Sequence, residues 1–266
     1  MFENSKTGSS IIRSEEYLTS DYLPEKPVGR DEEIQQVANA VRPLTHRKSP
    51  KNLLVYGPAG VGKTICIKHV FDHLEEETRV KPIYINCWQY NTRPSFLTEL
   101  LIQLGYPAPR KGMPVDELLS KLREWLDKNR TVVVALDEVD QLDAKTQILY
   151  DLQLVNEEAE NPIGVILVSN QQPSKIKLDP RSTSRLSCQI LRFTQYTESQ
   201  LREILEKRVE QAFRPGRVAD GVVERIAEIV LEESGDCRQA IDLLFRAGRR
   251  AEREGETDLT IDQIEL

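Results

Sequence analysis

The stretch NLLVYGPAGVGKT, residues 52–64, decides the fold. A short apolar run at 52–56 leads directly into the segment GPAGVGKT, and a helical pattern follows over residues 63–77. A GxxxxGKT segment between a strand and a helix is the phosphate-binding loop pattern, because its backbone N–H groups and the helix N-terminus converge on phosphate oxygens. The sequence therefore predicts a site for nucleotide phosphates. The residues expected to contact the nucleotide are Gly57, Pro58, Ala59, Gly60, Val61, Gly62, Lys63, Thr64 and Ile65.

Polar side chains after two later apolar runs complete the predicted site. Asp137 and Glu138 follow one run, and Asn170 follows the next. We expect Lys63 to reach the β- and γ-phosphates, and Thr64 and Asp137 to hold Mg²⁺. Glu138 is expected to polarise a water for attack on the γ-phosphate, and Asn170 to orient that water. The alternatives are a pair of solvated carboxylates and an ordinary turn-forming asparagine.

Apolar runs alternate with helical patterns along most of the chain. The runs lie at 52–56, 81–87, 131–136, 163–169 and 188–193, and the later helical patterns at 94–104, 114–129 and 143–160. This alternation predicts an α/β fold whose five-stranded parallel sheet is covered on both faces. After about Tyr196 only helical patterns remain, so a small all-helical lid domain is expected to follow. We expect Asp31 to cap an earlier helix. The predicted parts are a lightly packed N-terminal arm (1–23), a nucleotide-binding domain (24–195) and the lid (196–266).

Three arginines are candidates for contacts with phosphate. Arg238 lies in the first turn of the third lid helix, where the helix dipole disfavours a cation, so a nucleotide phosphate would explain it. The alternative is an exposed arginine paired with a nearby aspartate. Arg185 and Arg181 lie between the fourth and fifth predicted strands, and either could enter a neighbouring subunit's site as an arginine finger. The alternative there is a local ion pair.

Composition limits the other functions. The chain has 266 residues with 36 basic and 43 acidic side chains, a net charge of −7, so a nucleic acid could bind only at a local patch. Residues 195–266 carry −6 of that charge. No apolar run approaches the ~20 residues that a membrane span needs, and the N-terminus lacks a signal-peptide pattern. The four cysteines form no CxxC pair, and His69 and His73 lack a third metal ligand.

Taken together, the motifs resemble those of the AAA+ ATPases, and more narrowly the archaeal Orc/Cdc-type replication initiators. The resemblance rests on YLTSDYLPEKPVGRDEEI (17–34), NLLVYGPAGVGKT, YINCWQY (84–90), LDEVDQL, LYDL, LDPR and SGDCRQAIDLLFRAGRRAE. It implies that Pro27, Val28 and Arg30 line an adenine pocket. It also implies that Asn170 is the first sensor, Arg238 the second, and Arg185 the finger, with Arg181 as the second choice for the finger.

The resemblance further implies what the chain does. It predicts a slow ATPase that uses ATP, ADP and Mg²⁺, acts in the cytoplasm near the nucleoid, and lacks the winged-helix domain that usually follows in this family. Duplex origin DNA would contact the insert at 91–117, which holds Arg93, Arg110 and Lys111. Other partners would be initiator subunits or the replicative helicase, with no membrane contact. Two alternatives stay open: a nucleotide-gated regulatory or scaffold ATPase that does not bind DNA, and a clamp-loader-like subunit.

Overall fold

The protein is seen here in a computed structural model that describes residues 10–19, 22–110, 112–128, 131–143, 145–176 and 185–264. It divides into two compact units, each described by itself below. The sheet unit contains Arg30–Pro58 and Gly62–Phe193. The helical unit contains Thr194–Leu266 together with Met1–Gly29 and Ala59–Val61, the middle of the phosphate loop.

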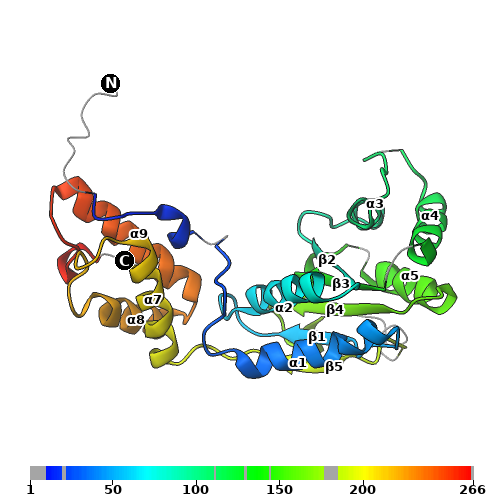
Figure 1. Cartoon of the computed structure of the whole chain (residues 1–266), viewed down its shortest axis with the longest axis horizontal. Coiled ribbons are helices and arrows are strands. Elements are labelled where there is room, and N and C mark those ends of the chain that lie inside the picture. The colour runs from blue at the N-terminus through cyan, green and yellow to red at the C-terminus, as the bar shows by residue number, and fades with distance from the viewer. Residues whose placement is uncertain are drawn as a thin grey trace. The chain divides into compact units, whose positions relative to one another are not determined.

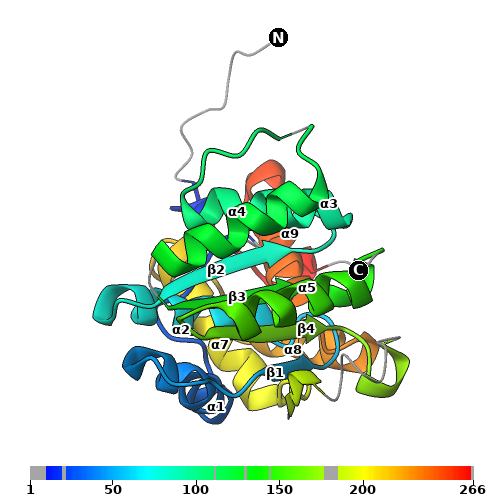
Figure 2. The same ribbon diagram turned by 90° about the vertical axis from the view of Figure 1, so that its right-hand side faces the viewer.

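The sheet unit is built on five parallel strands, as predicted. These are β1 (Leu53–Tyr56), β2 (Lys81–Asn86), β3 (Val132–Asp137), β4 (Ile163–Ser169) and β5 (Gln189–Arg192). They pair in the order β2-β3-β4-β1-β5, so β1 lies between β4 and β5 (Figures 1 and 2). Every residue of β3 and β4 is buried, which explains their continuous apolar sequences. Because all the strands run the same way, residues that follow β1, β3 and β4 meet at one edge of the sheet.

Helices cover this sheet. They are α1 (Asp31–Val41), α2 (Lys63–Glu77), α3 (Arg93–Leu104), α4 (Val115–Lys128) and α5 (Lys145–Glu158). The helix α3 begins with a capping box in which the Thr92 hydroxyl accepts from the Ser95 N–H. The prediction that Asp31 caps α1 is wrong, because Arg30 holds the N-cap position and makes no side-chain cap there. Asp31 is the first helical residue, where its negative charge favours the helix dipole.

The helical unit contains α7 (Glu198–Ala212), α8 (Val222–Glu233) and α9 (Cys237–Glu254). Its core also includes residues from the start of the chain, since Ile11 is fully buried and Ile12 is 5% exposed. The Arg13 N–H donates to the Ala212 carbonyl (2.7 Å), and the Ile12 N–H donates to Glu252 Oε1 (3.0 Å). Ile11, Ile12 and Leu18 therefore belong to this unit's core, where the sequence predicted a lightly packed arm. In the described ranges, no helix combines the length and the apolar character needed to cross a bilayer.

Candidate functional site

The phosphate-loop pattern folds into a sharp turn between β1 and α2. At Gly57 a Cβ atom would lie 2.3 Å from the Phe193 carbonyl oxygen, so only glycine fits this close approach. Gly62 has a φ of 89°, a left-handed conformation that glycine adopts without strain, and it serves as the N-cap of α2. The loop therefore delivers the next residue, Lys63, to the first position of a 15-residue helix. The positive end of that helix dipole points into the loop.

Lys63 is 6% exposed, and its ammonium group is surrounded by oxygen atoms. Its Nζ donates to the carbonyl oxygens of Gly57 (2.8 Å) and Pro58 (2.6 Å) and to Asn170 Oδ1 (2.8 Å). The last contact joins residues 107 positions apart in the chain. Lys63 and Asn170, which the sequence placed in one site, therefore lie side by side at the carboxyl edge of the sheet.

Asp137, at the end of β3, is the centre of a second cluster. The carboxylate is 6% exposed, and its Oδ2 accepts from the Thr64 hydroxyl (2.6 Å) and the Tyr84 hydroxyl (2.5 Å). Its Oδ1 accepts from the Glu138 N–H (2.9 Å). Three donors from three different residues therefore fix the position of this buried carboxylate. Burial, reinforced by the nearby charge of Asp137, raises the pKa of the Tyr84 hydroxyl, which therefore remains a donor at neutral pH.

Glu138 follows directly and adopts an unusual backbone conformation. Its φ of 57° lies in the left-handed region, which few non-glycine residues occupy and which is enriched at functional sites. The turn separates the two carboxylates, so that Asp137 stays on the buried strand while Glu138 is half-buried. Within the described ranges, the Glu138 carboxylate makes no hydrogen bond or ion pair, which leaves its oxygens available to accept a proton from a water.

The tip of β4 is fixed by a hydrogen bond that the sequence did not indicate. The buried Ser169 hydroxyl donates to Asp140 Oδ1 (2.6 Å) and accepts from the Gln171 N–H (2.9 Å). This holds the turn on both sides of Asn170, whose amide oxygen faces Lys63. The side chain of Asn170 and the turn around it are therefore both held by hydrogen bonds, which an ordinary turn-forming asparagine does not require.

The oxygen atoms at this edge fit a magnesium ion better than a transition metal. Thr64 Oγ1 and Asp137 Oδ2 lie 2.6 Å apart. Mg²⁺ typically takes one or two such protein oxygens and completes its shell with water and substrate phosphates. In the part of the chain that the structure describes, no three His, Cys, Asp or Glu side chains gather as a metal cage. The set therefore suits a metal that arrives with a phosphate ligand.

The predicted adenine-pocket residues have different surroundings. Arg30 is buried in the sheet unit, where its Nη1 pairs with Glu33 Oε1 (2.8 Å) and its guanidinium lies 5.4 Å from the Phe193 ring centre. These contacts give Arg30 a structural role at the start of α1. Val28 belongs to the helical unit and is half-buried.

The other candidate arginines are exposed, and each has a carboxylate nearby. Arg238 lies in the first turn of α9, as predicted, with its Nε 3.9 Å from Asp236 Oδ1. Arg185 Nη1 lies 3.8 Å from Glu157 Oε1, so the local ion pair considered as its alternative is present, at long distance. Both are more than half exposed, and such pairs contribute little and exchange readily. Arg181 lies outside the described residues.

The insert at 91–117 is helical over α3, and its two arginines have partners within the chain. Arg93 makes two hydrogen bonds of 2.7 Å to Asp151, a carboxylate on α5 that is 2% exposed. Arg110 pairs with Glu99 at 3.3 Å. Lys111 lies outside the described residues. Arg93 therefore joins α3 to α5, and contact of the insert with duplex DNA stays a prediction.

Two residues of the site were not singled out from the sequence. Tyr84 lies within YINCWQY, and Asp140 within LDEVDQL. The only sequence signal for these two residues is that both motifs are typical of the family that the chain resembles. Their roles depend on contacts with Asp137 and Ser169, 53 and 29 positions away, which local patterns do not reveal.

Comparisons with known proteins identify the family and the fold. A family model described as an AAA domain matches residues 46–176, and one described as a Cdc6 AAA+ ATPase-type lid domain matches residues 202–266. The chain is 36% identical to an ORC1-type DNA replication protein of Pyrococcus abyssi, over 98% of this chain and 65% of that protein. A relative of the same name from Thermococcus onnurineus is 37% identical over 98% and 66%. The structure of the Aeropyrum pernix ORC1 protein in complex with DNA superposes with a TM-score of 0.87, at 32% identity, over 96% of this chain and 69% of that one.

The chain belongs to the ORC1-type DNA replication protein family. Its sheet unit and helical unit are the AAA+ fold and the Cdc6-type lid of that family. The chain spans about 65% of the length of the curated ORC1-type relatives it matches. The Pyrobaculum aerophilum Cdc6p structure, at 23% identity and a TM-score of 0.86, shares the fold.

Proposed function

We propose that this chain is the ATP-binding and slowly hydrolysing module of an ORC1-type replication initiator. The observation that carries the proposal is the convergence of Lys63, Asn170, Thr64, Asp137 and Glu138 at one edge of the sheet. Each is the residue type that phosphate binding or water activation requires, and together they come from three separate segments. Family membership supports the same activity.

Each residue has a distinct task in this proposal. The loop N–H groups and Lys63 bind the phosphates, and Lys63 exchanges its carbonyl partners for phosphate oxygens of greater charge. Thr64 and Asp137 hold Mg²⁺, which would supply charge neutralisation to the β- and γ-phosphates. Glu138 accepts the proton of the attacking water, and Asn170 orients that water. Tyr84 keeps the Asp137 carboxylate in place.

The remaining assignments rest on the resemblance and on the family. Arg238 would report the nucleotide state to the lid, and Arg185 would act on the nucleotide of a neighbouring subunit. ATP binding and its release as ADP would then control contacts with duplex DNA, with other initiator subunits or with a helicase, in the cytoplasm at the nucleoid. The Aeropyrum pernix relative in complex with DNA supports DNA as a partner.

A Lys63→Ala variant tests the phosphate-loop assignment. The removal of a charge-assisted contact made by a buried ammonium should reduce ATP affinity at least tenfold, since such contacts are worth about 1.5–3 kcal/mol. Lys175→Ala, which removes an exposed lysine on a short turn after β4, is the matched control. Titration calorimetry with ATP and Mg²⁺ measures both. Equal affinity of the two variants would refute the assignment.

One observation favours the regulatory alternative that does not bind DNA. The insert's arginines are paired internally, and residues 195–266 carry −6 of the net charge of −7, so neither feature attracts DNA. Duplex binding at moderate salt, with and without ATP, separates the two functions. If the chain binds ATP but does not bind duplex DNA under either condition, the result supports the regulatory alternative.

A further inference from the structure

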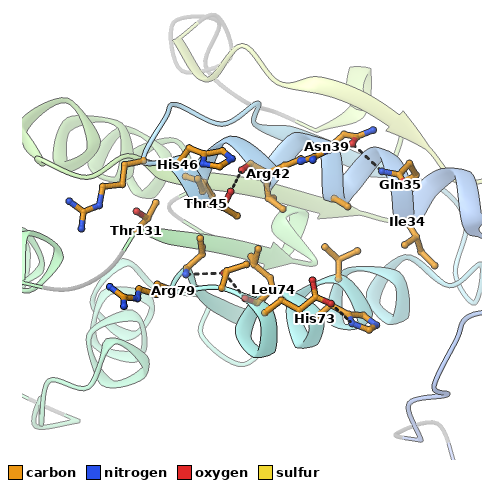
Figure 3. Close-up of a pocket in the computed structure, with 18 of the residues that line it drawn as sticks. Ile34, Gln35, Asn39, Arg42, Thr45, His46, His73, Leu74, Arg79 and Thr131 are labelled. Carbon is orange, nitrogen blue, oxygen red and sulfur yellow. Dashed lines mark hydrogen bonds and ion pairs between the residues drawn. The ribbon is translucent and has the colours of Figure 1, made fainter.

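An open groove lies in the sheet unit, and none of the nucleotide residues is among the residues that line it (Figure 3). It has a volume of about 1240 Å³ and runs between α2 on one side and α1 with the following short helix, η2 (Arg42–His46), on the other. Val80 and Thr131, which line its base, directly precede β2 and β3. The groove therefore lies at the amino ends of strands, whereas Asp137 and Asn170 lie at carboxyl ends.

The groove concentrates positive charge on an otherwise acidic chain. Arg42, Arg47 and Arg79 line it, and all three histidines of the protein, at positions 46, 69 and 73, do so as well. The segment RPLTHRKSPK at 42–51 contains four lysines and arginines and no acidic residue. Among the residues that the structure describes, Arg42, Arg47 and Arg79 form no ion pair. The one acidic side chain of the described lining, Glu77, lies 3.5 Å from the His73 imidazole.

These cations are held on a defined backbone. Arg47 is in the left-handed region at the end of η2, with its N–H bonded to the Leu44 carbonyl (3.0 Å). The Lys48 N–H donates to the Pro43 carbonyl (3.0 Å), and the Lys51 N–H to the Ala40 carbonyl (3.0 Å). The turn therefore presents its side chains from a fixed position, while the side chains themselves are exposed.

The lining excludes two kinds of partner. A protein partner would find little apolar surface here, because Leu44, Val70 and Leu74 are at most 8% exposed and Ile34 is only half-buried. A single strand of nucleic acid needs aromatic rings on which bases stack, and no Phe, Tyr or Trp is among the described residues that line the groove. What remains is a group of exposed arginines, Arg42, Arg47 and Arg79, whose charge suits the phosphates of a duplex.

We propose that this groove binds the sugar–phosphate backbone of duplex DNA without regard to sequence. The inference rests on the proposed function in assuming that the chain acts on DNA, and it assigns that contact to a surface other than the 91–117 insert. The guanidinium fork of an arginine bonds two phosphate oxygens at once, so Arg42, Arg47 and Arg79 would make the main contacts. Arg93, by contrast, already directs two of its donor groups to Asp151.

The test compares two triple variants of the whole chain with the same loss of charge. The groove variant carries Arg42→Gln, Arg79→Gln and Arg47→Asn, because asparagine tolerates the left-handed backbone. The control carries Lys175→Gln, Lys207→Gln and Arg225→Gln, exposed cations outside the groove. A fluorescent 20-base-pair duplex of arbitrary sequence is titrated by anisotropy over a series of salt concentrations, and ATP affinity is measured in parallel.

We expect the logarithm of the wild-type binding constant to fall linearly with the logarithm of salt concentration. The groove variant should bind more weakly and with a slope shallower by about 2–3, close to 0.9 for each phosphate that the variant no longer neutralises, while the control keeps the wild-type slope. Both variants should retain wild-type ATP affinity, so a failure of ATP binding in every protein would count against the proposed function alone.

Three results would overturn the inference. The first is a wild-type protein that does not bind the duplex at low salt. The second is a groove variant whose affinity and slope match those of the control, since net charge would then explain any change. The third is a labelled polyglutamate peptide that binds the wild type and not the groove variant, while both bind the duplex equally, which would identify an acidic polypeptide as the partner.

Discussion

The hydroxyl of Tyr84 offers a sharp test of how the site is built. Tyr84→Phe deletes one oxygen atom, the donor that lies 2.5 Å from Asp137 Oδ2, and leaves the packing of the ring unchanged. A hydrogen bond to a charged group is worth about 1.5–3 kcal/mol. For a unit of this size, each kcal/mol shifts the melting temperature by about 2–4 °C, so we expect a decrease of about 3–12 °C.

The matched control is Tyr150→Phe, because Tyr150 is 48% exposed on α5. Its hydroxyl makes no hydrogen bond within the described ranges, so its loss should change the melting temperature by less than about 1 °C. Thermal unfolding followed by circular dichroism compares the two variants with the wild type. If both variants melt together with the wild type, the hydroxyl does not support Asp137, and the account of the cluster is wrong.

The same variant predicts a dependence on pH. Burial and the charge of Asp137 raise the pKa of Tyr84 above the ordinary value of 10. A group whose pKa is raised on folding stabilises the protein below its unfolded pKa, and that contribution is lost as the pH rises above it. The stability difference between wild type and Tyr84→Phe should therefore be constant from pH 7 to about 9.5 and shrink above pH 10. A difference that widens with pH would contradict the assignment.

Two further predictions concern buried groups. Arg93→Ala leaves the carboxylate of Asp151 buried without its partner, so it should lower the free energy of unfolding by about 3–5 kcal/mol. The control is Arg246→Ala, which removes an exposed arginine paired with Asp242 and should lower the free energy of unfolding by less than about 1 kcal/mol. Urea titration measures both variants, and equal losses of stability would refute the buried role of Arg93. Burial raises the pKa of the Cys66 thiol to about 12, so a thiol reagent at pH 8 should label it only in urea; rapid labelling of the native protein would contradict this.

Local patterns were enough to predict the sheet and the main site residues. Short β-branched runs bounded by glycine or charged residues indicate buried parallel strands, and the ends of such strands are where polar side chains gather. Asp137, Glu138 and Asn170 could therefore be named from their places at strand ends, and Lys63 from the phosphate-loop pattern. Their contacts in the structure follow from the shared direction of the strands.

Contacts between distant segments were beyond the reach of these patterns. Ile11 and Ile12 form a run of only two apolar residues, too short to show a period, yet they complete the core of the helical unit. The role of Arg93 depends on Asp151, which lies 58 positions away and looks like an ordinary polar residue of a helix. The cationic groove could not be predicted from the sequence, because its cations come from two separate segments, 42–47 and Arg79, that only the fold brings together.

The claim that Glu138 is the general base is the centre of the account, and a single-turnover experiment with Glu138→Gln tests it most directly. The variant should bind ATP and Mg²⁺ with wild-type affinity, since the Glu138 carboxylate forms no hydrogen bond or ion pair with Lys63 or Thr64 in the described structure. Its release of phosphate should be slower by about 10²–10⁴-fold, the contribution of a positioned base. Release at the wild-type rate would remove Glu138 from the mechanism and contradict the account.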